Sequence, residues 1–249
     1  MRRGASVAAA VFGVITACAG FAHAQQSCRG TLYLTIDTGS MKPAEEIAAI
    51  LRKHQVKATF FVSNEKTWRG DGAMDDAWKP FYQALVLDGH AFGSHTWRHW
   101  YLRRDAPGGK VAYLGPGGQR EDLDQQQLCT EIRRADERFR ELTGRKLDPI
   151  WRAAGGRHTP RALAFARACG YEHVGWSDAG FLGDELPSET YPNRKLLDRA
   201  LANLRDGDIL MMHLGIRSRK DPFWPVLDPL LAGLKQKGFC FATIPERRK

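Results

Sequence analysis

The stretch LTIDTGSM, residues 34–41, decides how this chain of 249 residues is interpreted. A strand-like apolar run, Thr31–Ile36, leads into it and stops at Asp37. Gly39 then permits a tight turn. Asp37 could cap the helix that follows, but Ser40 is better placed for that role. We therefore predict that Asp37 is a reactive carboxylate at the end of a strand.

Outward from this stretch, strand-like runs alternate with helical patterns. Strands are predicted at 31–36, 57–62, 90–94, 149–153, 172–177, 208–213 and 239–243. Helices are predicted near 43–54, 78–88, 125–143, 160–170, 193–205 and 222–237. This alternation predicts one α/β domain with a parallel sheet, which is either open or closed as a barrel.

Local signals mark several helix ends. Thr159 followed by Pro160 is typical of a helix start, with a capping hydroxyl and then proline in the first helical position. Gly170 and Gly238 stand where helices should end before the next strand. Two long loops that contain Gly and Pro, and that follow strand ends, are predicted at 103–124 and 178–193.

The first 24 residues have the pattern of a signal peptide. Arg2 and Arg3 precede an apolar run, and Ala22-His23-Ala24 is a small-x-small cleavage site. We predict a signal peptide at 1–24, a mature domain at 25–249 without a transmembrane segment, and a periplasmic or secreted protein. A lipoprotein attached through Cys18 is the second interpretation, and a buried N-terminal helix is the third.

Export would permit disulfides among the cysteines that remain. Four cysteines allow three pairings, and we favour Cys28 with Cys240, because that bridge would tie the two ends of the domain. The alternative is that some of the four are small buried apolar residues, which for Cys169 is an equal alternative.

The chain is basic, with a formal net charge of +9 that falls by two if Arg2 and Arg3 are removed. A basic surface attracts anionic polymers or cell envelopes. The charge is scattered, not arranged in stripes with aromatic residues, so we predict no nucleic-acid partner. A merely solvated basic surface is the plainer interpretation.

Polar side chains follow several predicted strands directly. In a parallel α/β fold these strand ends lie on one face, so the side chains should converge there. The residues are Asp37, His95, His99, Arg152, Asp178 and His213. His95 and His99 are four apart, a spacing at which two imidazoles on a helical turn reach one divalent ion. The alternative is one rim histidine and one core histidine.

Five segments resemble, in order and approximate spacing, the motifs of polysaccharide deacetylases, the NodB-type domains of carbohydrate esterase family 4. They are TIDTG at 35–39, HTWRH at 95–99, Trp151-Arg152, WSD at 176–178 and ILMMH at 209–213. The resemblance covers nearly all of the mature chain. It implies a distorted (β/α)7 barrel and metal-assisted hydrolysis of an N-acetyl group on a saccharide polymer.

The resemblance also implies roles for individual residues. Asp37 matches the general base, His213 the general acid, and Arg152 the residue that holds the base. His95 and His99 match ligands of a divalent metal, zinc being the one we expect. Asp178 is assigned a supporting role.

Substrate contacts are implied for Gly155, Trp176 and Met211, and the N–H of Gly155 would contact the oxyanion. Ala154 and Gly155 replace a proline and an aromatic residue of the family pattern, so one wall of the groove is expected to be missing.

Thr38 departs from the family pattern, in which a second aspartate binds the metal. A neutral hydroxyl is a poorer ligand than a carboxylate. Three outcomes are open: a weakened metal site on the two histidines with Asp37 or water as a further ligand, a metal-independent amide hydrolase, or an inactive carbohydrate-binding module. We favour the first, acting on N-acetylated saccharides, and the sequence leaves the oligomeric state open.

Overall fold

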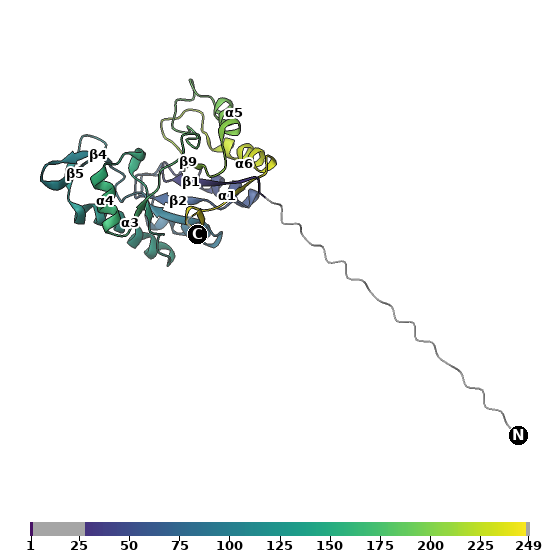
Figure 1. Cartoon of the computed structure of the whole chain (residues 1–249), viewed down its shortest axis with the longest axis horizontal. Helices are drawn as coiled ribbons and strands as arrows, with labels where there is room; N and C mark the ends of the chain where they lie inside the picture. The colour runs from purple at the N-terminus through teal and green to yellow at the C-terminus, as the bar shows by residue number, and fades with distance from the viewer. Residues whose placement is uncertain (2–27, 248–249) are drawn as a thin grey trace.

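The computed structural model describes Met1 and residues 28–247 (Figure 1). The predicted signal peptide, apart from Met1, and Cys18 lie outside the described residues. β1 (Gly30–Asp37) is central, because it pairs with three strands. Its first residues pair with β10 (Phe239–Phe241), its last residues pair with β2 (Thr59–Val62), and residues 33–37 pair with β9 (Ile209–His213).

The sheet continues from β2 through β3 (Ala91–Ser94), β7 (Ile150–Trp151) and β8 (Glu172–His173), always in parallel pairing. Beyond β8 the chain closes onto β9 without forming a full strand. The N–H of Ser177 donates to the carbonyl of Ile209, and Phe181 forms a parallel bridge with Met211. This irregular closure confirms the predicted α/β fold as a distorted (β/α)7 barrel.

Helices cover the outside of the sheet. They are α1 (Ala44–His54), α2 (Lys79–Leu87), α3 (Gln125–Thr143), α4 (Pro160–Ala168), α5 (Asn193–Asn203), α6 (Leu227–Gln236) and α7 (Ile244–Arg247). Short 3₁₀ turns lie at 76–78, 107–109, 154–156 and 224–226. α1 shows why they pack there: Ile47, Ala48 and Leu51 recur at helical spacing, are buried, and join the main core. No helix in residues 28–247 has both the length and the apolar character needed to cross a membrane.

The predicted loop at 103–124 is wrong. The chain there forms an antiparallel sheet of β4 (Tyr101–Ala106), β5 (Lys110–Leu114) and β6 (Arg120–Leu123). Its glycines make the two turns, while Val111, Tyr113 and Leu123 are buried against neighbours that include residues of α3 and α4. Figure 1 shows this sheet at one end of the molecule, beside α4. The predicted loop at 178–193 is confirmed up to the start of α5.

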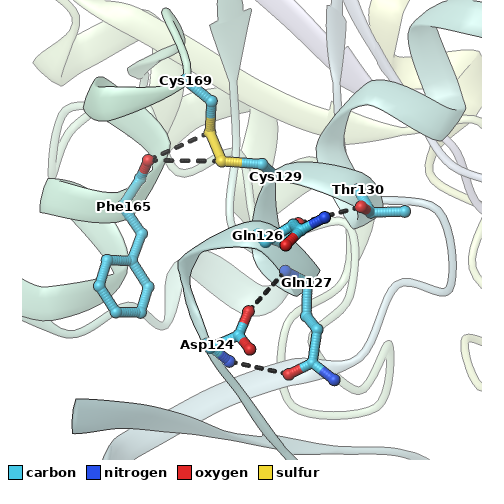
Figure 2. Close-up of a disulfide and its surroundings, with 7 residues drawn as sticks. All are labelled: Asp124, Gln126, Gln127, Cys129, Thr130, Phe165 and Cys169. Atoms are coloured by element: carbon cyan, nitrogen blue, oxygen red, sulfur yellow. Dashed lines mark hydrogen bonds between the residues drawn. A yellow bond between two sulfur atoms is a disulfide. The ribbon is translucent and has the colours of Figure 1, made fainter.

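Side chains and a disulfide secure α3 (Figure 2). Asp124 accepts a hydrogen bond from the N–H of Gln127, whose side chain accepts from the N–H of Asp124, which forms a capping box. Cys129, one turn into the helix, is bonded to Cys169 at the end of α4. The favoured bridge between Cys28 and Cys240 is also present, so the predicted pairing is confirmed and Cys169 is not a free thiol.

Most of the predicted helix ends are confirmed. Thr159 accepts a hydrogen bond from the N–H of Ala162 and begins α4. Gly170 and Gly238 have φ angles of 88° and 86°, which glycine adopts without steric cost. The prediction that Ser40 caps α1 is wrong, because the helix begins after Pro43 with no capping side chain.

Candidate active site

Two of the predicted residues meet at the ends of neighbouring strands. Asp37 and His213 are register partners at the carboxyl ends of β1 and β9, so their side chains leave the sheet in the same direction. Asp37 is only 2% exposed. The parallel topology therefore brings together a carboxylate and an imidazole that are far apart in sequence.

Arg152 holds the Asp37 carboxylate from the end of β7. Its Nη1 donates to Oδ1 of Asp37 at 2.7 Å, and its other donors bind Thr35 and the carbonyls of Val174 and Gly175. Burial alone would raise the pKa of Asp37, but the charge and hydrogen bond of Arg152, together with the charge of His213, hold this pKa below its usual value. Asp37 is therefore an ionised carboxylate at neutral pH, with one oxygen fixed by Arg152.

The carboxylate that contacts His213 is that of Asp184, whereas the supporting role was predicted for Asp178. Oδ2 of Asp184 accepts from the N–H of His213 at 2.8 Å, and Nδ1 of the imidazole lies 3.2 Å from both carboxylate oxygens. Burial alone would lower the pKa of His213, but the charge and hydrogen bond of Asp184 raise it to about 9. Asp178 is exposed. The one available signal was that Asp184 lies in the long predicted loop.

His95 and His99 meet, although not on a helical turn as predicted. They lie in a loop after β3 in which Thr96 and His99 have φ angles of 63° and 55°. Their Nε2 atoms are nevertheless 3.2 Å apart. Nδ1 of His95 contacts the carbonyl of Arg152 at 2.9 Å, and burial lowers the pKa of His95 to about 3. A neutral His95 that donates through Nδ1 leaves the lone pair of Nε2 facing His99.

The two imidazoles are placed so that both can bind one metal ion. Thr38, which stands at the position of the third ligand, does not fit that role. Two nitrogens bound to one tetrahedral zinc at about 2.1 Å lie roughly 3.4 Å apart, close to the separation observed here. Thr38 is instead engaged with Ser63, with 2.7 Å between the hydroxyl oxygens. Within residues 28–247 no three His, Cys, Asp or Glu side chains are arranged to hold a metal. Among the described residues, the two histidine ligands therefore have no carboxylate at the position of Thr38, and the nearest carboxylate oxygen to Nε2 of His95 is Oδ2 of Asp37 at 3.4 Å.

Two aromatic rings pack on the glycines at the position where one wall of the groove was expected to be missing. Tyr101, the first residue of β4, packs on Gly155, where an added Cβ would lie 2.8 Å from Cε1 of the ring. Trp176 packs in the same way on Gly156, with a corresponding distance of 2.5 Å to Cη2. Both rings are half-buried, and that of Tyr101 lies 6.4 Å from His99. Because Gly155 and Gly156 have no side chain, the rings of Tyr101 and Trp176 can pack directly on their backbone.

The third predicted substrate contact, Met211, is buried within β9 at 2% exposure. Its N–H donates to Gly180 and its carbonyl accepts from Leu182, so its backbone is occupied in closing the barrel. Tyr101 was missed because nothing local connects it with Gly155. Its place follows from the antiparallel sheet, which the sequence analysis took to be a loop.

The saccharide deacetylase activity that the sequence resemblance implies leads to a prediction for Tyr101: removal of its ring should weaken saccharide binding while leaving the chemical step intact. Tyr101→Ala should raise the KM for an N-acetylated oligosaccharide roughly threefold to tenfold with little change in kcat, because one stacking surface is lost. Tyr101→Phe, which keeps the ring, is the matched control. Steady-state acetate release is the measurement. An unchanged KM in Tyr101→Ala would show that Tyr101 does not contact the substrate.

The fold of this chain is that of the polysaccharide deacetylase-like proteins. The family model of polysaccharide deacetylases matches residues 24–174, more than half of the chain. A chitooligosaccharide deacetylase from Azorhizobium caulinodans is 26% identical over 230 residues, covering 87% of this chain and 94% of that protein. The chain therefore belongs to the polysaccharide deacetylase family.

Solved structures share the fold at lower sequence identity. A family 4 carbohydrate esterase from Streptomyces lividans, in complex with acetate, has a TM-score of 0.64 and 18% identity, over 88% of this chain and 94% of its own. A CE4 family pseudoenzyme from Bacillus anthracis has a TM-score of 0.65 and 19% identity, and the match covers 87% of this chain and 64% of that one. At such identities the likeness establishes the fold alone.

Proposed function

We propose that this protein removes N-acetyl groups from a polysaccharide or oligosaccharide by hydrolysing the amide bond. The observation that carries the proposal is a matched base and acid on adjacent strands. Arg152 keeps Asp37 ionised, and Asp184 keeps His213 protonated, so each group holds the protonation state that its role requires at neutral pH. A protein that only bound saccharides would not need this opposed pair.

In the proposed reaction Asp37 removes a proton from water as the oxygen of that water bonds to the amide carbonyl carbon. Arg152 holds the other carboxylate oxygen and so fixes the direction in which the base acts. The N–H of Gly155 donates to the oxygen on which negative charge accumulates. His213 gives its proton to the nitrogen as the C–N bond breaks, which releases acetate and an amine.

A divalent metal bound by His95 and His99 would add polarisation of the carbonyl oxygen. The contact between Thr38 and Ser63 predicts that such binding is weak. It also supports a second candidate function, saccharide binding without turnover, because the anionic metal ligand is absent while the fold is retained. The fold shared with a family pseudoenzyme is consistent with this alternative.

One substitution distinguishes these functions. Thr38→Asp should raise zinc affinity about tenfold or more, since a carboxylate is the better ligand, and it should increase acetate release from chitooligosaccharides. Thr38→Ser, which keeps the hydroxyl, is the matched control. The measurements are zinc titration by calorimetry and acetate release with and without chelator. Oligosaccharide binding with no acetate release by the natural protein at saturating zinc would refute the hydrolase in favour of the binding module.

We also propose that residues 1–24 direct export, so that the substrate is met in the periplasm or outside the cell. Two disulfides in the folded domain support an oxidising compartment. N-terminal sequencing of protein from the periplasmic fraction should begin at Gln25, whereas an intact Met1 or a lipid-modified Cys18 would contradict this cleavage.

A further inference from the structure

A cavity of about 300 Å³ adjoins the candidate active site on the side of β9. Asp184 and His213 belong both to the site and to the cavity wall. The cavity is also lined by Arg219 and Lys42, with the half-buried ring of Trp224 as an apolar surface. None of these last three residues has a part in the proposed reaction.

Arg219 is a buried cation without an anionic partner among residues 28–247. It is 5% exposed, and its guanidinium donates only to neutral groups: the carbonyls of Leu186 and Tyr191 and the side-chain oxygen of Asn193. Its Nε is buried and has no acceptor within the same residues. A buried charge is costly unless it is paired, and the other deeply buried arginine of the site, Arg152, is paired with Asp37.

The remaining charges around the cavity favour an anion. Lys42 and Glu46 also line the cavity, and both are exposed. Asp184 forms an ion pair with His213. The raised pKa of His213 keeps its imidazole protonated, so the charges of these two residues cancel. The cavity therefore presents two cations, Arg219 and Lys42, against one solvated carboxylate.

We propose that this cavity binds the carboxylate of an acidic sugar residue next to the N-acetylated residue that is hydrolysed. An arginine N–H and a lysine ammonium are the donors that carboxylates pair with in proteins, and Trp224 provides a surface for a sugar ring. This inference rests on the proposed function, because it places the acidic residue beside the reacting acetamide. It narrows the substrate class to N-acetylated saccharides that carry carboxylates.

Calorimetric binding to the natural full chain tests the proposal with an acidic saccharide, its uncharged ester and a neutral oligosaccharide. The probes are a tetrasaccharide of alternating N-acetylglucosamine and glucuronic acid, its methyl ester, and neutral chitotetraose. We expect the acid to bind at least about tenfold more tightly than its ester. A disaccharide of N-acetylglucosamine and N-acetylmuramic acid, compared with its own methyl ester, distinguishes a lactyl carboxylate from a uronate. Equal affinity of acid and ester in both pairs overturns the proposal.

Protein variants test whether the preference for the acid over its ester depends on the cations of this cavity. Lys42→Gln and Arg219→Gln should each reduce the preference for acid over ester, and the double variant should abolish it. Lys220→Gln is the matched control, because it removes the neighbouring charge at an exposed position that pairs with Glu189. A preference that survives Lys42→Gln and the double variant, or that is lost equally in Lys220→Gln, contradicts the assignment to this cavity. Because Arg219 also holds the loop at 186–193, circular dichroism must verify that its variants fold.

The proposed function and this inference fail in different ways. If the acid is preferred but no saccharide releases acetate, the hydrolase proposal falls and the binding site stands. If chitotetraose and the acidic tetrasaccharide release acetate equally well and bind equally well, the hydrolase stands and the acidic-sugar site falls.

Discussion

Asp37→Asn is expected to lower kcat for acetate release by about 10³-fold, because the amide cannot accept the proton of the attacking water. KM should change little, since the amide oxygen would remain a hydrogen-bond acceptor for Arg152 in the same place. The measurement is steady-state acetate release from chitooligosaccharides. Asp76→Asn, at an exposed ion pair with Arg138, is the matched control and should retain full activity.

The same substitution should also cost stability. Arg152 is fully buried, and neutralising its partner leaves that charge uncompensated, so we expect the free energy of unfolding to fall by about 3–5 kcal/mol. Urea denaturation monitored by circular dichroism checks this. If Asp37→Asn kept both its activity and its stability, Asp37 would be neither the base nor the partner of a buried arginine.

Asp184→Asn is expected to move the alkaline limb of activity downward in pH. The Asp184 carboxylate raises the pKa of His213 to about 9, and without that charge the pKa should fall to or below the ordinary value of about 6.5. Activity that depends on protonated His213 would then be lost at a pH about two units or more below the pH at which the natural protein loses it. The pH dependence of kcat/KM from pH 5 to 10 is the measurement.

Stability should follow the same titration. The folded state holds the His213 proton more tightly than the unfolded state, so the stabilisation is fully present below about pH 6.5 and is lost as pH rises through 9. At its largest this contribution is about 3 kcal/mol. Asp184→Asn should abolish this pH-dependent part of stability. Asp178→Asn tests the original assignment: if it shifted the alkaline limb as much as Asp184→Asn, the structural correction would be wrong.

Much of the fold follows from sequence because the determining signals are local. Apolar runs, helical spacing and capping residues specify where strands and helices form, and parallel connections then bring the strand ends to one rim. Asp37, Arg152 and His213 stand directly after strands or at their last residue. Their convergence therefore required only the order of elements. The antiparallel sheet at 101–123 was missed because its glycine-rich turns outweighed its short strands in the pattern.

What the sequence determined by itself is a parallel α/β fold, the residues at its strand ends and the absence of a second carboxylate at Thr38. Only the tertiary structure decided that Asp184 supports His213, that Tyr101 fills the space above Gly155, and that Arg219 is buried without an anion among the described residues. These three facts depend on contacts between segments far apart in the chain. Their geometry is set by packing and by irregular loops, and neither leaves a periodic trace in the sequence.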